Sequence, residues 1–94
     1  MIRIVKMVFK EENVKEFTKI FSESKKFIEA MQGCKSVKLL NEVNHKNIFF
    51  TYSLWDSEED LNNYRNSEVF KNVWAKTKVL FDAKPEAWSV EEIA

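Results

Sequence analysis

The residues best suited to chemistry in this chain are aromatic and gather in its second half. Tyrosine and tryptophan each carry a polar group on an apolar ring, so several of them around one space can line a pocket for a flat aromatic ligand. The residues that could meet in this way are Tyr52, Trp55, Tyr64, Phe70, Trp74, Phe81 and Trp88. Aromatic residues at helical spacing also form ordinary hydrophobic cores, and this is their commoner use. The sequence therefore leaves open a pocket and a filled core.

Other catalytic constellations are missing. The chain has one His, one Cys and one Gly, so it carries no phosphate-binding glycine loop and no His cluster for zinc or iron. We therefore expect neither a metal nor a cofactor. His45 is either a solvated turn residue or a general base, and the run 58–60 is either the charged start of a helix or an acid/base pair. Cys34 has no partner cysteine, and we expect it to be structural.

Length and charge narrow the class of protein. The 94 residues leave room for one domain, 1–94, and 45% of them are hydrophobic. Fifteen basic residues balance fifteen acidic ones, so the chain has no excess of positive charge for binding a nucleic-acid backbone. No apolar run approaches the roughly 18 residues of a membrane span. The charges within Met1 to Lys6 do not suit a signal peptide, so we expect a cytoplasmic protein that binds neither nucleic acid nor membranes.

The elements that must position the aromatic residues follow from periodicity and from cap signals. Apolar and β-branched residues predict strands, and apolar residues spaced by three and four predict amphipathic helices. Asn13 is the expected N-cap of the first helix, Gly33 the left-handed residue at its end, and Ser57 and Ser67 the caps of a second helix and its restart. The expected ranges are strand 2–9, helix 12–32, strands 36–43 and 48–55, a helical run from 57 that ends before Pro85, and strand 87–93.

This order predicts an α+β, ferredoxin-like βαββαβ plait with an antiparallel sheet and both helices on one of its faces. The turn 44–47 contains two asparagines, which tolerate the positive φ angles of a hairpin. Apolar residues occupy both parities of the strands: Ile48, Phe50 and Leu54 on one, Phe49 and Trp55 on the other. Because the helices cover one face only, the other face is expected to meet a second copy, forming a homodimer with a closed eight-stranded α/β barrel.

The stretch 54–71 resembles the signature of the antibiotic biosynthesis monooxygenase family. The shared features are a strand-ending Trp55, an acidic helix start capped by Ser57, an aromatic residue one turn on at Tyr64, and a Ser-x-x-Phe restart at Ser67 and Phe70. The resemblance extends more loosely over the whole chain. It implies the dimeric α/β barrel, and in some relatives the oxidation of phenols, anthrones or quinols by O₂ without metal or flavin.

Other relatives cleave heme, with an Asn, a Trp and an iron-binding His at the positions that Val5, Tyr64 and Trp74 hold here. An indole nitrogen has no lone pair to offer iron, so the presence of Trp74 in place of the His argues against heme cleavage. We therefore predict a cofactor-independent, monooxygenase-like enzyme for a small hydrophobic, aromatic or quinol-type compound. Tyr64 is the expected catalytic residue, within a pocket lined by Tyr52, Trp55, Tyr64, Phe70 and Trp74. The alternatives are a non-enzymatic module that binds small molecules and a purely structural dimer.

Overall fold

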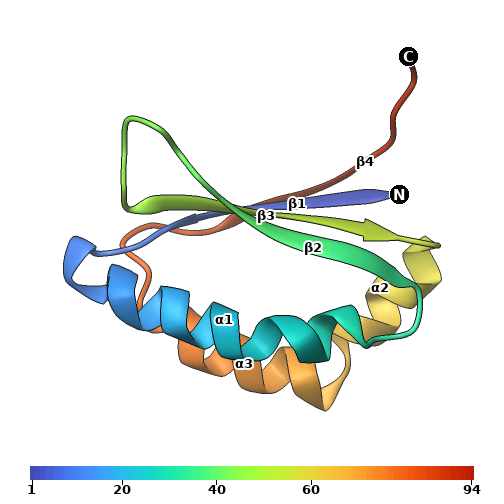
Figure 1. Ribbon diagram of the computed structural model, residues 1–94, viewed down its shortest axis with the longest axis horizontal. Coiled ribbons are helices and arrows are strands. Elements are labelled where there is room, and N and C mark those ends of the chain that lie inside the picture. Colours follow the sequence, from blue (N-terminus) through green and yellow to red (C-terminus); the bar gives the residue numbers. More distant parts are fainter.

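The computed structural model describes all 94 residues. The four strands form one layer and the three α-helices a second (Figure 1). A short 3₁₀ turn, η1 (Glu11–Asn13), precedes the first helix. The elements in chain order are β1 (Ile2–Val8), α1 (Val14–Glu29), β2 (Cys34–Asn41), β3 (Ile48–Trp55), α2 (Glu58–Arg65), α3 (Glu68–Lys78) and β4 (Glu86–Val90). No helix is both long and apolar enough to span a bilayer.

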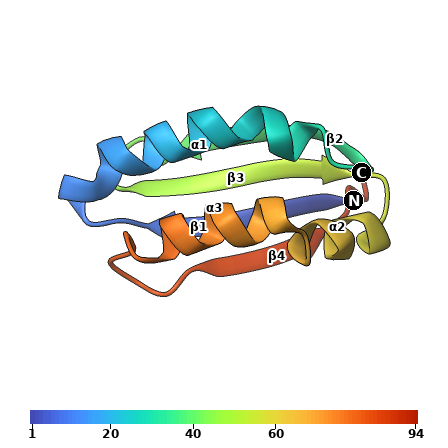
Figure 2. The ribbon, with the colours of Figure 1, turned by 90° about the horizontal axis from the view of Figure 1, so that it is seen from below.

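The sheet has the order β2-β3-β1-β4, and every neighbouring pair is antiparallel. All three helices lie on one face: α1 runs along the β2–β3 side, and α2 and α3 along the β1–β4 side (Figure 2). The predicted ferredoxin-like α+β fold is therefore confirmed, with the second helical run divided into α2 and α3.

One parity of the central strands faces the helices and forms the core. Met7 pairs with Phe49 across β1 and β3, and both are at least 95% buried, as is Trp55 at the end of β3. The buried cluster consists of Met7, Phe9, Phe17, Phe21, Ile28, Val37, Phe49 and Leu80.

The other parity forms an open sheet face that is also largely apolar. Ile4 lies between Tyr52 and Trp88 in the register of β3, β1 and β4. Leu40 and Trp88 are each 45% exposed. The expectation that both faces of the sheet carry apolar residues is therefore met, and the helices leave this second face uncovered (Figure 1).

The two serine caps form as predicted. The Ser57 hydroxyl accepts a hydrogen bond from the Asp60 backbone N–H at 3.1 Å, and the Ser67 hydroxyl accepts one from the Phe70 N–H at 3.2 Å. Each satisfies a backbone donor that a helix start leaves unpaired. The second cap begins α3 directly after α2 ends at Arg65. It therefore sets the direction of α3 and of the side chains that α3 carries.

Three local predictions were correct only in part. Asn13 occupies the N-cap position of α1 as predicted, but its side chain makes no capping hydrogen bond; its amide N–H donates instead to the Leu80 carbonyl at 3.3 Å. The first helix ends at Glu29 rather than at 32, although Gly33 does adopt a left-handed φ of 82°. The β2–β3 hairpin forms, but no non-glycine residue has a positive φ, so the turn does not use the asparagines as expected.

Candidate functional site

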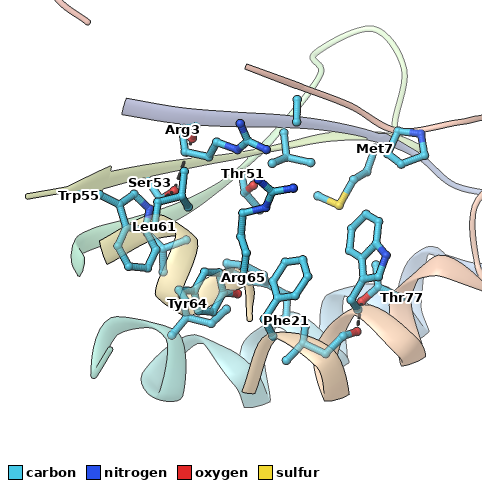
Figure 3. A pocket seen from close by; sticks show the side chains of 18 of the residues that line it. Arg3, Met7, Phe21, Thr51, Ser53, Trp55, Leu61, Tyr64, Arg65 and Thr77 are labelled. Atoms are coloured by element: carbon cyan, nitrogen blue, oxygen red, sulfur yellow. Dashed lines mark hydrogen bonds between the residues drawn. The ribbon is translucent and has the colours of Figure 1, made fainter. Parts of the chain in front are cut away.

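A cavity of about 350 Å³ lies between the helix-facing side of the sheet and helices α2 and α3 (Figure 3). Its lining is mostly hydrophobic, with contributions from β1, β3, all three helices and the start of β4. A volume of this size falls at the lower end of the range typical of small-molecule sites.

Four of the predicted pocket residues meet along one wall of this cavity. Tyr64 on α2 stacks on Trp55 with ring centroids 5.1 Å apart, and meets Phe70 edge-on at 5.3 Å. Phe70 in turn stacks on Trp74, with centroids 5.8 Å apart and planes 11° from parallel. The restart at Ser67 makes this continuous wall possible, because it turns α3 so that Phe70 and Trp74 follow Tyr64.

The other predicted aromatic residues lie elsewhere. Tyr52 belongs to the open face of the sheet, beside Met1, Ile2 and Leu54, and does not line this cavity. Trp88 is on the same open face, since it pairs through Ile4 with Tyr52. Phe81 packs on Phe9 with centroids 5.2 Å apart and belongs to the core.

Trp55 is held in place by a buried polar contact. Its indole N–H donates to the Ser53 hydroxyl at 2.9 Å, and that hydroxyl donates to the Arg3 carbonyl at 3.4 Å. Trp55 is only 2% exposed. Its one polar group is already used, so Trp55 can offer a ligand only its apolar surface.

Tyr64 has the opposite character. Its hydroxyl group has no hydrogen-bond partner and is not sealed from solvent, and its side chain lines the cavity. Burial, and to a smaller extent the charge of the Cys34 thiolate, raises the pKa of Tyr64 to about 12. The phenol is therefore neutral near pH 7, so it can donate a hydrogen bond to a ligand oxygen but cannot serve as a general base there.

Two cavity residues were missed at the sequence level. Arg3 on β1 and Arg65 on α2 both extend toward the space between the sheet and Tyr64 (Figure 3). Burial, and then the positive charge of Arg65, lowers the pKa of the Arg3 guanidinium. Arginine nevertheless stays charged at any ordinary pH. One signal was available: among the chain's fifteen basic residues, only these two are arginines.

The remaining candidates lie outside the cavity. His45 is in the β2–β3 loop, where its Nδ1 lies 2.6 Å from Glu42 Oε2 and lowers the pKa of that carboxyl. Glu58, Glu59 and Asp60 form the acidic first turn of α2. Burial raises the pKa of the Cys34 thiol. The structure brings together no group of three or more His, Cys, Asp or Glu residues able to hold a metal ion.

Comparison with known proteins agrees with this architecture. Residues 1–76 match the family described as "Antibiotic biosynthesis monooxygenase". No curated protein matches the chain in sequence.

Solved structures match the fold closely. The chain is similar to a conserved protein from Methanosarcina mazei Go1, with a TM-score of 0.86, 24% identity, and coverage of 92% of this chain and 86% of that one. A structure described as an antibiotic biosynthesis monooxygenase matches with a TM-score of 0.91 and 12% identity over 100% of both chains. The Rv0793 protein from Mycobacterium tuberculosis matches with a TM-score of 0.85 and 15% identity over 99% of this chain and 96% of that one.

Proposed function

The chain belongs to the antibiotic biosynthesis monooxygenase family, and from that premise we propose that its cavity binds a small aromatic or quinol-type compound and promotes its oxidation by O₂ without a metal or flavin. The observation that carries the proposal is the wall of Trp55, Tyr64, Phe70 and Trp74 along a cavity of about 350 Å³. A flat, electron-rich ring fits such a wall by offset or edge-to-face packing.

Oxidation by O₂ of an electron-rich substrate needs few catalytic groups from the protein. In the oxidation of a methylene carbon such as that of an anthrone, one atom of O₂ becomes the new carbonyl oxygen and the other leaves as water. The substrate therefore supplies all the electrons, and no external reductant is consumed. The protein has to hold the substrate in its electron-rich, deprotonated form, exclude competing water and leave room for O₂.

Tyr64 is the residue we assign to the substrate oxygen. As a neutral phenol it donates a hydrogen bond, and a hydrogen bond to a charged acceptor is stronger than one to a neutral acceptor. Tyr64 therefore favours the phenolate or enolate over the neutral substrate. Trp74 and Phe70 would pack against the ring, while Trp55, held by Ser53, backs the Tyr64 ring.

We also propose that the protein is a homodimer joined through the open sheet face. Trp88 and Leu40 are each 45% exposed on that face. Burying the two open faces against each other would remove this apolar surface from water, at about 25 cal/mol per Å². The cavity lies on the opposite side of the sheet, so each subunit would keep its own.

A second candidate function is a binding module that holds an aromatic metabolite without altering it. The observation that favours it is the lack of a base in the cavity: Glu86 is the only carboxylate among the lining residues, and it pairs with Lys6 at 3.8 Å. An enzyme built on this site would have to rely on substrates acidic enough to ionise with the help of neighbouring positive charge.

Oxygen uptake by metal-free protein tests the proposed activity. The assay covers hydroquinones, catechols and anthrones, with Tyr64→Phe as the test variant. Tyr52→Phe is the matched control, because it removes the chain's other tyrosine hydroxyl from the opposite face of the sheet. Loss of one general-acid or hydrogen-bonding group typically costs about 10²-fold in rate. We expect uptake above the uncatalysed rate that falls in Tyr64→Phe and persists in Tyr52→Phe. No uptake across the panel would overturn the enzymatic proposal in favour of the binding module.

A further inference from the structure

The two arginines of this chain converge on one cavity although they are far apart in the sequence. Arg3 is the second residue of strand β1, and Arg65 lies in the last turn of α2. The other basic residues are lysines, and only these two side chains have the planar, forked guanidinium that matches a carboxylate through two parallel hydrogen bonds. Arginine, the basic residue whose shape best matches a carboxylate, therefore occurs in this chain only at the cavity to which we assign the aromatic ligand.

A helix C-terminus is also a favourable place for a basic side chain. The Arg65 guanidinium, however, does not fold back on the carbonyls of α2. It extends toward the sheet, into the cavity that Arg3 and Thr51 also line (Figure 3). This direction brings it to the same part of the cavity as Arg3, and it is the reason that the two charges influence each other.

Neither guanidinium is neutralised by the protein. No carboxylate lies within 4.0 Å of Arg3 or Arg65, since the ion pairs of the chain are Lys6–Glu86, Lys35–Asp56 and His45–Glu42. The only hydrogen bond of the Arg3 side chain goes to the Ser89 hydroxyl at 3.1 Å. Arg65 makes none. Two unpaired like charges beside an apolar cavity repel each other, and an anion between them would relieve the repulsion.

We propose that Arg3 and Arg65 form a carboxylate subsite, so that the preferred ligand is an aromatic acid whose ring packs against the Tyr64–Trp74 wall and whose carboxylate meets the two guanidinium groups. This inference rests on the proposed function in taking the cavity as the ligand site, and it narrows the substrate class to compounds with an acidic group. It does not depend on turnover.

Isothermal titration calorimetry with two matched probes tests the subsite. The probes are 2-naphthoate and its uncharged amide, 2-naphthamide, which share a ring system and differ in charge. A charge-assisted hydrogen-bonded contact contributes about 1.5–3 kcal/mol, which corresponds to roughly tenfold to a hundredfold in affinity. We expect 2-naphthoate to bind the wild-type protein at least about tenfold more tightly than the amide, and this preference to weaken as salt concentration rises.

The variants Arg65→Gln and Arg3→Gln should each reduce the preference for 2-naphthoate without changing the affinity for 2-naphthamide. Arg65→Lys keeps the charge but not the fork, so it should retain an intermediate preference. The control is Lys76→Gln, which removes one exposed positive charge from α3 outside the cavity and should leave both affinities unchanged. The comparison of the two probes on the wild-type protein needs no variant. It therefore still tests the subsite if a substitution at Arg3 impairs folding.

The outcomes separate this inference from the proposed function. Equal binding of the two probes by the wild-type protein would overturn the carboxylate subsite and leave the aromatic site intact. A preference for 2-naphthoate that persists in both arginine variants would also overturn it. Failure of both probes to bind would contradict the aromatic site itself, and the carboxylate subsite with it.

Discussion

The phenol of Tyr64 lies stacked on the indole of Trp55, with ring centroids 5.1 Å apart and planes 26° from parallel. The indole is itself anchored, because its N–H donates to the buried Ser53 hydroxyl at 2.9 Å. The stack therefore fixes the plane of Tyr64 while its hydroxyl group stays without an intramolecular partner. An oriented, unpartnered donor of this kind at the cavity surface suits the binding of an anionic oxygen.

The high pKa of Tyr64 makes stability fall in alkaline solution. The folded-state pKa is about 12, above the value of about 10 for an unfolded tyrosine. The folded state thus holds its phenolic proton more tightly, so this contribution to stability is complete below about pH 10 and is lost as the pH rises from there to about 12. Its size is about 2 to 3 kcal/mol. Urea denaturation of the wild type and of Tyr64→Phe across this range measures it.

We expect the wild type to lose more stability than Tyr64→Phe as the pH rises. Identical pH dependence in the wild type and Tyr64→Phe would contradict the burial of the phenol in the folded state.

Gly33 should not tolerate any side chain. Its φ of 82° is left-handed, and a Cβ there would overlap Asp60 Oδ2 and lie 2.5 Å from Asp60 Cβ. The left-handed conformation alone costs an alanine roughly 1–2 kcal/mol, and the overlap with the first turn of α2 adds to it. We expect Gly33→Ala to lower the free energy of unfolding by more than about 2 kcal/mol in urea denaturation.

Gly33→Asn separates the two causes. Asparagine accepts a left-handed φ more readily than alanine does, but it carries the same Cβ. Comparable destabilisation by both substitutions identifies the contact with Asp60 as the main cause. If Gly33→Asn is as stable as the wild type, the close approach of this turn to α2 is wrong.

Trp88→Glu should separate the proposed dimer. The substitution places a charge on the apolar open face, where a second sheet would have to bury it without a partner. Phe27→Glu is the control, because Phe27 is a 54% exposed aromatic residue on α1, away from that face. Light scattering coupled to gel filtration should give twice the 11.2 kDa chain mass for the wild type and Phe27→Glu, and one chain mass for Trp88→Glu. A wild-type protein of one chain mass would refute the dimer.

Local signals explain how much of the fold could be predicted from the sequence. Strand 48–55 was predicted with the bounds it has in the structure. The cap at Ser57 was identified from the carboxylate of Asp60 three residues later, and the cap at Ser67 from a second serine within the helical run. These features depend on neighbours in the chain, which the sequence shows directly. The N-cap position of Asn13 was predicted correctly, but its side-chain partner, the Leu80 carbonyl, is 67 residues away and could not be predicted from local sequence.

The site was predicted less completely, for two different reasons. Tyr52 and Trp55 have opposite parity on one strand, so their side chains point to opposite faces of the sheet. The sequence shows this parity, and the prediction that both line one pocket was wrong for Tyr52. Arg3 and Arg65 are different. Their residue type sets them apart from the lysines, but their meeting depends on how α2 crosses the sheet, which the sequence around either residue does not show.

The most direct test of the aromatic site uses the three tryptophan indole N–H groups as reporters in a ¹⁵N–¹H correlation spectrum. Trp55 and Trp74 line the cavity, and Trp88 lies on the opposite face of the sheet. Each signal is assigned by a single Trp→Phe variant, and the protein is then titrated with 1,4-dihydroxynaphthalene in the absence of oxygen. We predict that the Trp74 signal shifts with the ligand while the Trp88 signal stays in place. A shift of Trp88 alone, or of neither, would show that the cavity beneath the sheet is not where an aromatic ligand binds.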